Sequence, residues 1–160
     1  MDPLMKNITL MAAIIAHFVL VGADIFGQVV ISPVVLSAPP ASLSIFQGEY
    51  AYNSTVFWQP ANMVALGLLM LSLIANWSSP RRNLLILWLV GSVVISAVSL
   101  GFIFPEYGTI VSTPFSAAID PQLVARGEQW QVIAFVRMCL FLGLGLLPLI
   151  ALSRSSTRDG

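Results

Sequence analysis

The segment Leu84–Phe104 reads LLILWLVGSVVISAVSLGFIF and contains no charged side chain. A helix needs about 20 residues to cross the roughly 30 Å hydrocarbon core of a bilayer, so this segment is long enough to span it. Three other segments are long and predominantly apolar: Ile8–Ile31, Val56–Ala75 and Gln131–Leu152. The sequence therefore predicts an all-α fold, a four-transmembrane-helix bundle that forms a single membrane domain over residues 1–160.

The composition agrees with a protein that has lipid as its main solvent. Of the 160 residues, 58% are hydrophobic and only 9% are charged, whereas soluble proteins have about 25% charged residues. The formal net charge of zero offers no basic footprint for nucleic acid. Cys139 is the only cysteine and His17 the only histidine, so we expect no metal site and no cofactor held by such residues.

Charges in the connecting segments predict the orientation in the membrane. The N-terminus, the second loop and the C-terminus carry most of the basic residues: Lys6, Arg81, Arg82, Arg154 and Arg158. The positive-inside rule then places both termini in the cytoplasm and the two longer loops, 32–55 and 105–130, outside. Aromatic residues that favour the membrane interface gather near the outer ends: Tyr50, Tyr52, Trp58, Tyr107 and Trp130. We expect a multi-pass protein of a plasma or inner membrane.

The N-terminal segment has a second interpretation. Lys6 precedes an apolar run ending in Val21-Gly22-Ala23, which resembles the cleavage site of a signal peptide. The run continues to Leu36, however, and His17 would interrupt the apolar region of such a peptide. A retained membrane span is therefore the favoured interpretation.

Prolines and one capping pattern predict where the helices end and begin. Pro33 and Pro105 follow the first and third spans and are expected to mark their ends. Asp120-Pro121 is typical of an N-cap followed by proline at the first helical position. The fourth helix is thus expected to begin near Pro121, outside the membrane, and to lie against the first loop.

Polar side chains occur at membrane depth in the first span. His17, Asp24 and Gln28 fall within a stripe of about 40° when successive residues are turned by about 100°. A charged group at the centre of a membrane helix costs roughly 3 kcal/mol. The stripe is therefore expected to face the interior of the bundle.

Asp24 and Arg137 lie at matching depths, each about 10 Å from the outer end of its span at about 1.5 Å per residue. The sequence predicts an ion pair between them, with His17 deeper in the membrane. The side chains expected to complete hydrogen bonds around the pair are Gln28, Gln59 and Asn62. On the fourth span, Arg137 shares a face with Trp130 and Phe141.

Two interpretations of this pair stay open. It either fixes the register of the helices without a ligand, or it borders a wet pocket that receives a small polar or aromatic molecule. His17 is likewise either a satisfied interior histidine or a base and proton carrier.

The start of the fourth span resembles a known family. Residues 126–137 read RGEQWQVIAFVR, with Trp130 seven residues before Arg137 and a leucine-rich run after it. This pattern resembles the last helix of the anthrone-oxygenase-like family of small four-helix membrane proteins. An aromatic outer loop and a third span closing on Phe104-Pro105 fit along nearly the whole chain. The sequence departs from the family at Ala134, where members often carry asparagine.

The resemblance implies the oxidation of a hydrophobic, anthrone-like aromatic molecule by O₂ without a bound cofactor. In such a reaction His17 or Asp24 would remove a proton from the substrate, and Arg137 would stabilise the resulting enolate-like anion. An apolar wall would come from Trp58, Trp130 and Phe141.

A non-enzymatic membrane protein is the alternative: a ligand-binding or transport unit, or an accessory subunit of a larger membrane complex. Four helices leave little room for a two-state transporter in one chain, so transport would need a homo-oligomer. A proton path along Gln28, Asp24 and His17 is less favoured, because no polar residue continues this line inward on the first span.

Overall fold

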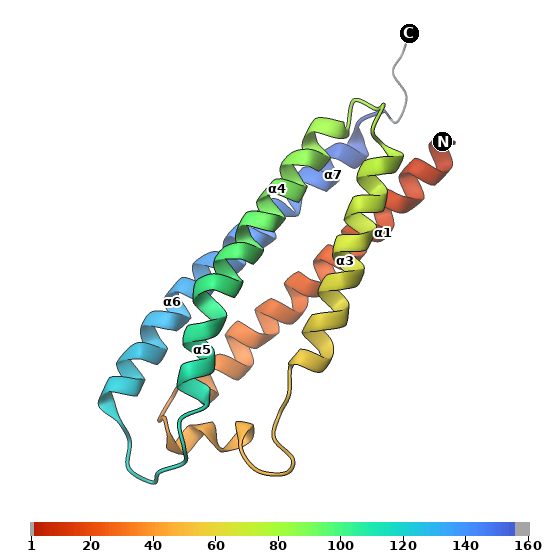
Figure 1. The fold of residues 1–160 in the computed structure, drawn as a ribbon. Helices are drawn as coiled ribbons and strands as arrows, with labels where there is room; N and C mark the ends of the chain where they lie inside the picture. Colours follow the sequence, from red (N-terminus) through yellow and green to blue (C-terminus); the bar gives the residue numbers. More distant parts are fainter. Residues whose placement is uncertain (1, 156–160) are drawn as a thin grey trace.

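The computed structural model describes residues 2–155, and over these residues the chain is helical with no β-strand. Four long helical rods run side by side (Figure 1). Each is long and apolar enough to cross a membrane, and their bounds are Pro3–Val35, Thr55–Ala75, Arg82–Val111 and Pro121–Ser153. The predicted all-α fold with four candidate spans is confirmed.

Three of the rods are composite. The first consists of α1 (Pro3–Phe26), a π-helical turn (Gly27–Ile31) and α2 (Ser32–Val35). The second is α3 (Thr55–Ala75), and a 3₁₀ helix (Ala41–Phe46) lies in the loop before it. The third consists of α4 (Arg82–Val98), a π-helical turn (Ser99–Ile103) and α5 (Phe104–Val111). The fourth consists of α6 (Pro121–Leu144) and α7 (Leu146–Ser153), which meet at Gly145.

The expectation that prolines end the first and third spans is wrong, because helix continues through Pro33 and Pro105. Proline lacks an N–H group and its ring clashes with the carbonyl four residues earlier. In both rods a π turn ends two residues before the proline. Its last hydrogen bond spans five residues, from Ser32 N to the Gly27 carbonyl and from Phe104 N to the Ser99 carbonyl. The wider turn accommodates the ring, so the helix extends beyond the predicted end of the span.

The predicted start of the fourth helix is confirmed. The Asp120 side chain accepts hydrogen bonds from the backbone N–H groups of Gln122 and Leu123, and Pro121 occupies the first turn. The backbone N–H of Asp120 also donates to the Pro39 carbonyl at 3.0 Å. The start of α6 is therefore held against the first loop, as expected.

Arg81 ties the other end of the bundle together, where both described ends of the chain and the α3–α4 connection meet (Figure 1). Its side chain is buried, with 3% of the residue exposed. The guanidinium donates to Asn7 Oδ1 at 2.7 Å and to the Arg154 carbonyl at 2.6 and 3.0 Å, and it also reaches the Leu152 carbonyl. Burial lowers the pKa of Arg81 because desolvation disfavours the cation. The hydrogen bonds to these oxygen acceptors offset the cost of burying the charge.

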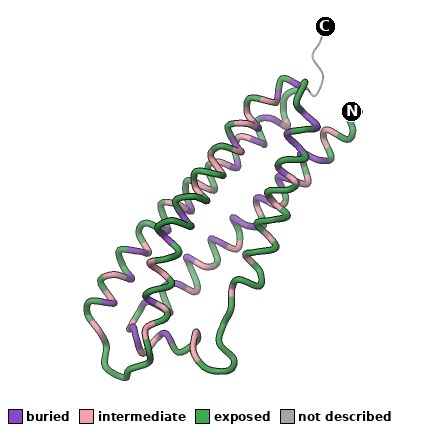
Figure 2. The backbone as a smooth tube through the Cα atoms, viewed as in Figure 1, coloured by how far each residue is buried: buried purple, intermediate pink, exposed green. Residues whose placement is uncertain are grey.

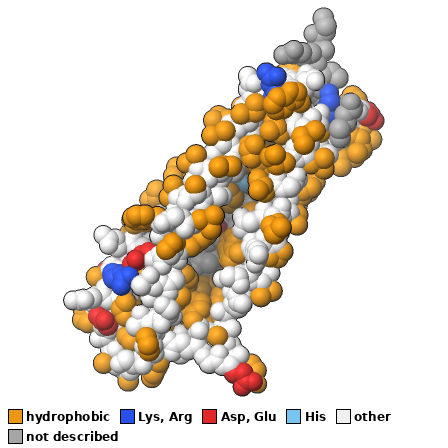
Figure 3. Space-filling view, viewed as in Figure 1, with side chains coloured by type: hydrophobic (Ala, Val, Ile, Leu, Met, Phe, Trp, Pro, Cys, Tyr) orange, Lys and Arg blue, Asp and Glu red, His pale blue; other side chains and the backbone are white. Residues whose placement is uncertain are grey.

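The core follows the axis of the bundle in two clusters. One surrounds Trp88 near the end that holds the termini, and the other surrounds Trp130 near the opposite end. Buried positions recur on the inward faces of the rods, while the outward faces are exposed (Figure 2). These outward faces are largely hydrophobic (Figure 3), as contact with lipid requires.

Candidate functional site

The predicted ion pair between Asp24 and Arg137 is present. Arg137 Nη2 lies 2.5 Å from Asp24 Oδ1, and the exposed fractions of the two side chains are 15% and 7%. The pair joins α1 to α6. Arg137 also lies over the ring of Phe104, with its guanidinium carbon 6.0 Å from the ring centroid. Phe104 is not among the predicted site residues, although it lies at the end of an apolar run next to Pro105.

Several polar atoms around this pair have no partner among the described residues. They are Asp24 Oδ2, Gln28 Oε1 and Arg137 Nε, and all three are buried. A guanidinium offers five N–H donors, and Arg137 uses one of them, in its bond to Asp24. Buried polar groups in proteins nearly always have partners. This part of the bundle therefore has unused acceptors and donors at membrane depth.

Contacts between helices show which other residues lie at the level of Asp24. Asn76 Nδ2 donates to the Lys6 carbonyl, and the rings of His17 and Trp88 are 5.5 Å apart. Counting residues from these contacts along α1, α3 and α4 places Gln59 and Ser96 within about one turn of the Asp24 level.

The face of α3 that carries Gln59 is covered at one end of the helix and open at the other. Leu73, Leu66 and Gln59 recur at intervals of seven residues and so share a face. Leu73 is only 7% exposed, but Leu66 is 50% exposed and Gln59 is also exposed. The core that covers Leu73 therefore does not extend to Gln59.

The corresponding face of α4 changes in the same way. Leu85 and Ser96 are separated by about three turns and share a face. Leu85 is fully buried, whereas Ser96 is exposed. Figure 3 shows the molecule hollowed along its middle, between α3 and the rod formed by α4 and α5. We call this feature the lateral hollow. By residue count, the exposed residues Gln59 and Ser96 lie near the level of the Asp24–Arg137 pair.

Asn62 is expected to hydrogen-bond at the ion pair, but it bonds to its own helix instead. Its Nδ2 donates to the Trp58 carbonyl of its own helix at 2.7 Å, and the residue is exposed. Trp58 is half-buried, and its ring meets Phe57 edge-on. These two residues and Gln59 thus lie on α3, which packs mainly against α1 and not against α6, the helix that carries Arg137.

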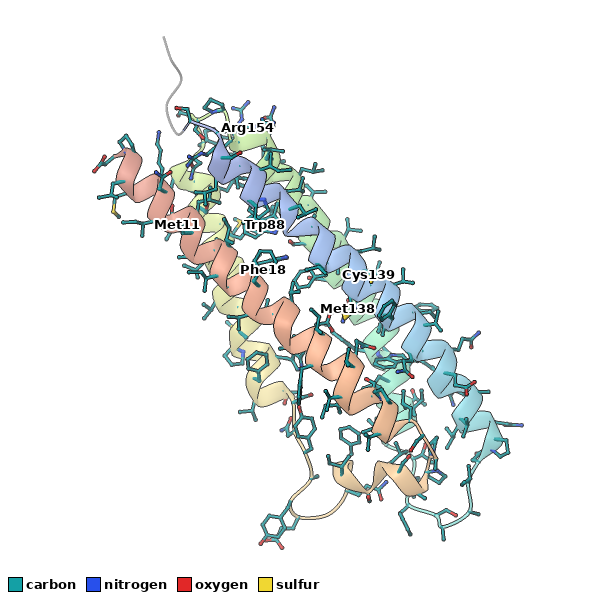
Figure 4. The ribbon with its side chains drawn as sticks, turned by 180° about the vertical axis from the view of Figure 1, so that it is seen from behind. Met11, Phe18, Trp88, Met138, Cys139 and Arg154 are labelled. Carbon is teal, nitrogen blue, oxygen red and sulfur yellow. The ribbon has the colours of Figure 1, made fainter. Side chains whose placement is uncertain are left out.

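His17 is a satisfied interior histidine. Its Nε2 donates to the Phe141 carbonyl at 3.2 Å, and its ring contacts the rings of Phe18, Trp88 and Phe141. Figure 4 shows Phe18 and Trp88 pointing into the space between α1 and the fourth rod. His17 is two turns from Asp24 along α1, or about 10 Å. Of the two interpretations of His17, the geometry favours the structural one.

Trp130 and Phe141 take different places on the fourth rod. Trp130 is buried in the outer core, and its Nε1 donates to the Ile103 carbonyl at 2.8 Å. Phe141 is half-buried beside His17, with ring centroids 4.4 Å apart. Arg137 contacts Asp24 and Phe104 instead. The predicted site residues therefore lie in four places: the ion pair with Gln28 on α1, a group on α3, His17 with Phe141, and Trp130 in the outer core.

No family is assigned. Comparison of the chain with models of protein families, with curated proteins and with solved structures finds no match. Within residues 2–155, no three His, Cys, Asp or Glu side chains come together as metal ligands. The chemistry available at the site is therefore that of a buried carboxylate, an arginine and an amide: they can hold an anion, accept a hydrogen bond and exchange a proton.

Proposed function

We propose that this chain is a multi-pass membrane protein that binds a small, weakly acidic aromatic molecule in the lateral hollow, where Arg137 holds its oxyanion. The observation that carries the proposal is the state of Arg137, which is largely buried and uses one of its five N–H donors. An arginine that served only as a structural partner of Asp24 would gain from a two-pronged contact with the carboxylate. Here the carboxylate keeps Oδ2 free instead.

The surroundings of Arg137 support a ligand with both apolar and polar parts. The Phe104 ring offers an aromatic surface beside the guanidinium, while Asp24 Oδ2 and Gln28 Oε1 can accept hydrogen bonds from a hydroxyl group. Because the hollow opens on the side of the bundle, a hydrophobic molecule can enter from lipid. These features fit a phenolic or enolisable aromatic molecule, which includes the anthrone-like class implied by the family resemblance.

Binding is tested with 1,8-dihydroxyanthrone as the probe and anthracene as an uncharged control, using the protein in lipid nanodiscs and its tryptophan fluorescence. Hydrogen bonds to charged groups contribute about 1.5–3 kcal/mol, so Arg137→Gln is expected to weaken dihydroxyanthrone binding by roughly 10- to 100-fold. Arg126→Gln, which changes an exposed arginine elsewhere on α6, is the matched control. Equal affinity of the wild type and Arg137→Gln would contradict the proposal.

A second candidate function, enzymatic oxidation, is favoured by the position of Asp24 Oδ2. This oxygen is unpartnered and belongs to the carboxylate that Arg137 contacts, so a base and an anion holder lie side by side. A proton from the substrate methylene would move to Asp24, and the carbanion would react with O₂. The methylene loses two hydrogens, one oxygen atom becomes the new carbonyl and the other leaves in water.

Oxygen uptake and quinone formation from 1,8-dihydroxyanthrone test this step. Asp24→Asn removes the base and is expected to abolish turnover above the uncatalysed rate, whereas His17→Gln is expected to retain it because His17 lies outside the site. Binding of the probe without turnover in the wild type would exclude the enzyme and leave the ligand-binding function.

The orientation with both termini in the cytoplasm is part of the proposal. It is supported by the gathering of Lys6, Arg81, Arg82 and Arg154 at the end of the bundle where the termini lie. In a Cys139→Ser background, Tyr50→Cys in the exposed first loop is expected to react with an impermeant maleimide added to intact cells. Ser78→Cys in the α3–α4 connection is expected to react only after permeabilisation, and the opposite pattern would reverse the orientation.

A further inference from the structure

A second concave feature lies between α5 and α6, away from the lateral hollow. It is a groove of about 450 Å³, a volume within the range of small-molecule sites. Its end nearest the loops is polar, with Glu106, Thr109 and Arg126, and the part toward the middle of the bundle is formed by Gly101, Ile103 and Ile133. The groove thus changes from charged to apolar along the helix axis, which is the polarity gradient of a phospholipid in a bilayer leaflet.

The charged end of the groove holds one cation, Arg126, and one anion, Glu106. Their ion pair leaves hydrogen-bonding atoms of both side chains available. Arg126 Nη2 and Nε both lie 2.8 Å from Glu106 Oε1. Glu106 Oε2 has no hydrogen-bond partner in the part of the chain that the structure describes. The two side chains are 42% and 41% exposed, so both remain accessible from the groove.

The wall and floor of the groove are well defined. Trp130 is fixed by its bond to the Ile103 carbonyl and by stacking on Tyr107, whose ring centroid is 4.5 Å away. At Gly101 an added Cβ would meet no atom within 4 Å. The absence of a side chain at this position keeps the apolar floor open.

We infer that this groove binds a phospholipid with a primary ammonium in its headgroup, such as phosphatidylethanolamine. The phosphate accepts hydrogen bonds from Arg126, the ammonium donates to Glu106, and one acyl chain lies over Gly101 and Ile133. Phosphatidylcholine has no N–H group to donate to Glu106, and phosphatidylglycerol has no cation to pair with it. The arrangement of charges therefore selects among headgroups as well as binding lipid.

Native mass spectrometry of the detergent-solubilised full chain tests this inference. The protein is delipidated and offered equal amounts of phosphatidylethanolamine, phosphatidylcholine and phosphatidylglycerol with identical acyl chains. The first bound lipid is expected to be phosphatidylethanolamine by about fivefold over either competitor, the upper end of what an exposed ion pair contributes. Glu106→Gln is expected to remove the preference over phosphatidylcholine.

Two glycine variants distinguish lipid binding in the groove from lipid binding elsewhere on the lipid-facing surface. Gly101→Leu fills the floor and is expected to reduce retention of the first lipid, whereas Gly22→Leu changes an exposed glycine of α1 where an added Cβ also meets nothing within 4 Å. Both variants should melt within a few degrees of the wild type. Equal retention of the three lipids by the wild type, or unchanged lipid binding in Gly101→Leu, would overturn the inference.

Discussion

Asp24 and Arg137 are joined through one oxygen and one nitrogen atom, Oδ1 and Nη2, although each side chain has a second atom that is buried without a partner. The contact links α1 and α6 at membrane depth, and it is also incomplete. A buried ion pair is not in itself strong evidence for stability, because the cost of desolvation offsets the attraction. Removal of a single partner is nevertheless costly, since it leaves the other charge buried and uncompensated.

A double-mutant cycle measures this coupling. Arg137→Gln and Asp24→Asn are each expected to lower the free energy of unfolding, Arg137→Gln by about 3 kcal/mol because it leaves a buried carboxylate unpaired. The double variant is expected to lose at least about 1 kcal/mol less than the sum of the single losses. Unfolding in mixed micelles with increasing SDS, followed by circular dichroism, provides the four values. Losses that add within about 0.5 kcal/mol would show that the pair is not coupled.

Gly145 and Gly143 differ in their surroundings by two side chains, those of His17 and Phe18. A Cβ at Gly145 would lie 2.9 Å from His17 Nε2, whereas a Cβ at Gly143 would meet nothing within 4 Å. Gly145→Ala is therefore expected to reduce stability by about 1–3 kcal/mol through overpacking. Gly143→Ala, the control, is expected to be neutral or stabilising by up to about 1 kcal/mol through helix propensity. Thermal unfolding in detergent compares the two, and equal melting temperatures would contradict the close packing of His17.

The hydrogen bond from Trp130 to Ile103 fixes α5 against α6. Trp130→Phe keeps an aromatic ring but leaves the carbonyl without this donor, so stability is expected to fall by about 1–2 kcal/mol. Hydrogen exchange is expected to increase in α5 and in the π turn Ser99–Ile103. Trp58→Phe, at a half-buried position where the indole makes no hydrogen bond to another described residue, is the control and should change stability by less than about 0.5 kcal/mol. Unchanged exchange in Trp130→Phe would contradict the role of this bond.

Arg81 and Arg82 are neighbours with different roles. Arg81 is buried with carbonyl and amide acceptors, and Arg82 lies over the exposed Trp77 ring, 5.5 Å from its centroid. Arg81→Ala is expected to cost about 3 kcal/mol or more through the loss of charged hydrogen bonds, and Arg82→Ala less than about 1 kcal/mol. Arg81→Lys should recover only part of the loss, because an ammonium cannot bridge the same acceptors. Similar losses in the two alanine variants, measured by chemical unfolding, would contradict this division.

The four spans and the ion pair could be predicted from the sequence for simple physical reasons. Apolar runs such as Leu84–Phe104 have only one stable environment, and Asp24 and Arg137 are costly at membrane depth unless they meet. The cap formed by Asp120 and Pro121 depends only on neighbouring residues, so it can be predicted from the local sequence.

Other features depend on tertiary geometry, which cannot be inferred from the pattern of residue types along the sequence. Prolines predict helix ends, but the π turns before Pro33 and Pro105 allow the helices to continue. Gln59 and Asn62 have the depth needed to reach Arg137, yet α3 does not pack substantially against α6, the helix that carries Arg137, and Asn62 bonds to its own helix. The separation of two helices is determined by packing along their whole length, so it cannot be inferred from residue types at one level.

The contacts of Arg81 have a consequence for the order in which the bundle assembles. Its carbonyl partners belong to residues 152 and 154, which are synthesised 71 and 73 residues after the arginine itself. During synthesis the guanidinium must therefore remain hydrated at the membrane surface while two further spans are inserted. The Arg81 contacts that close this end of the bundle can form only after α7 has been synthesised.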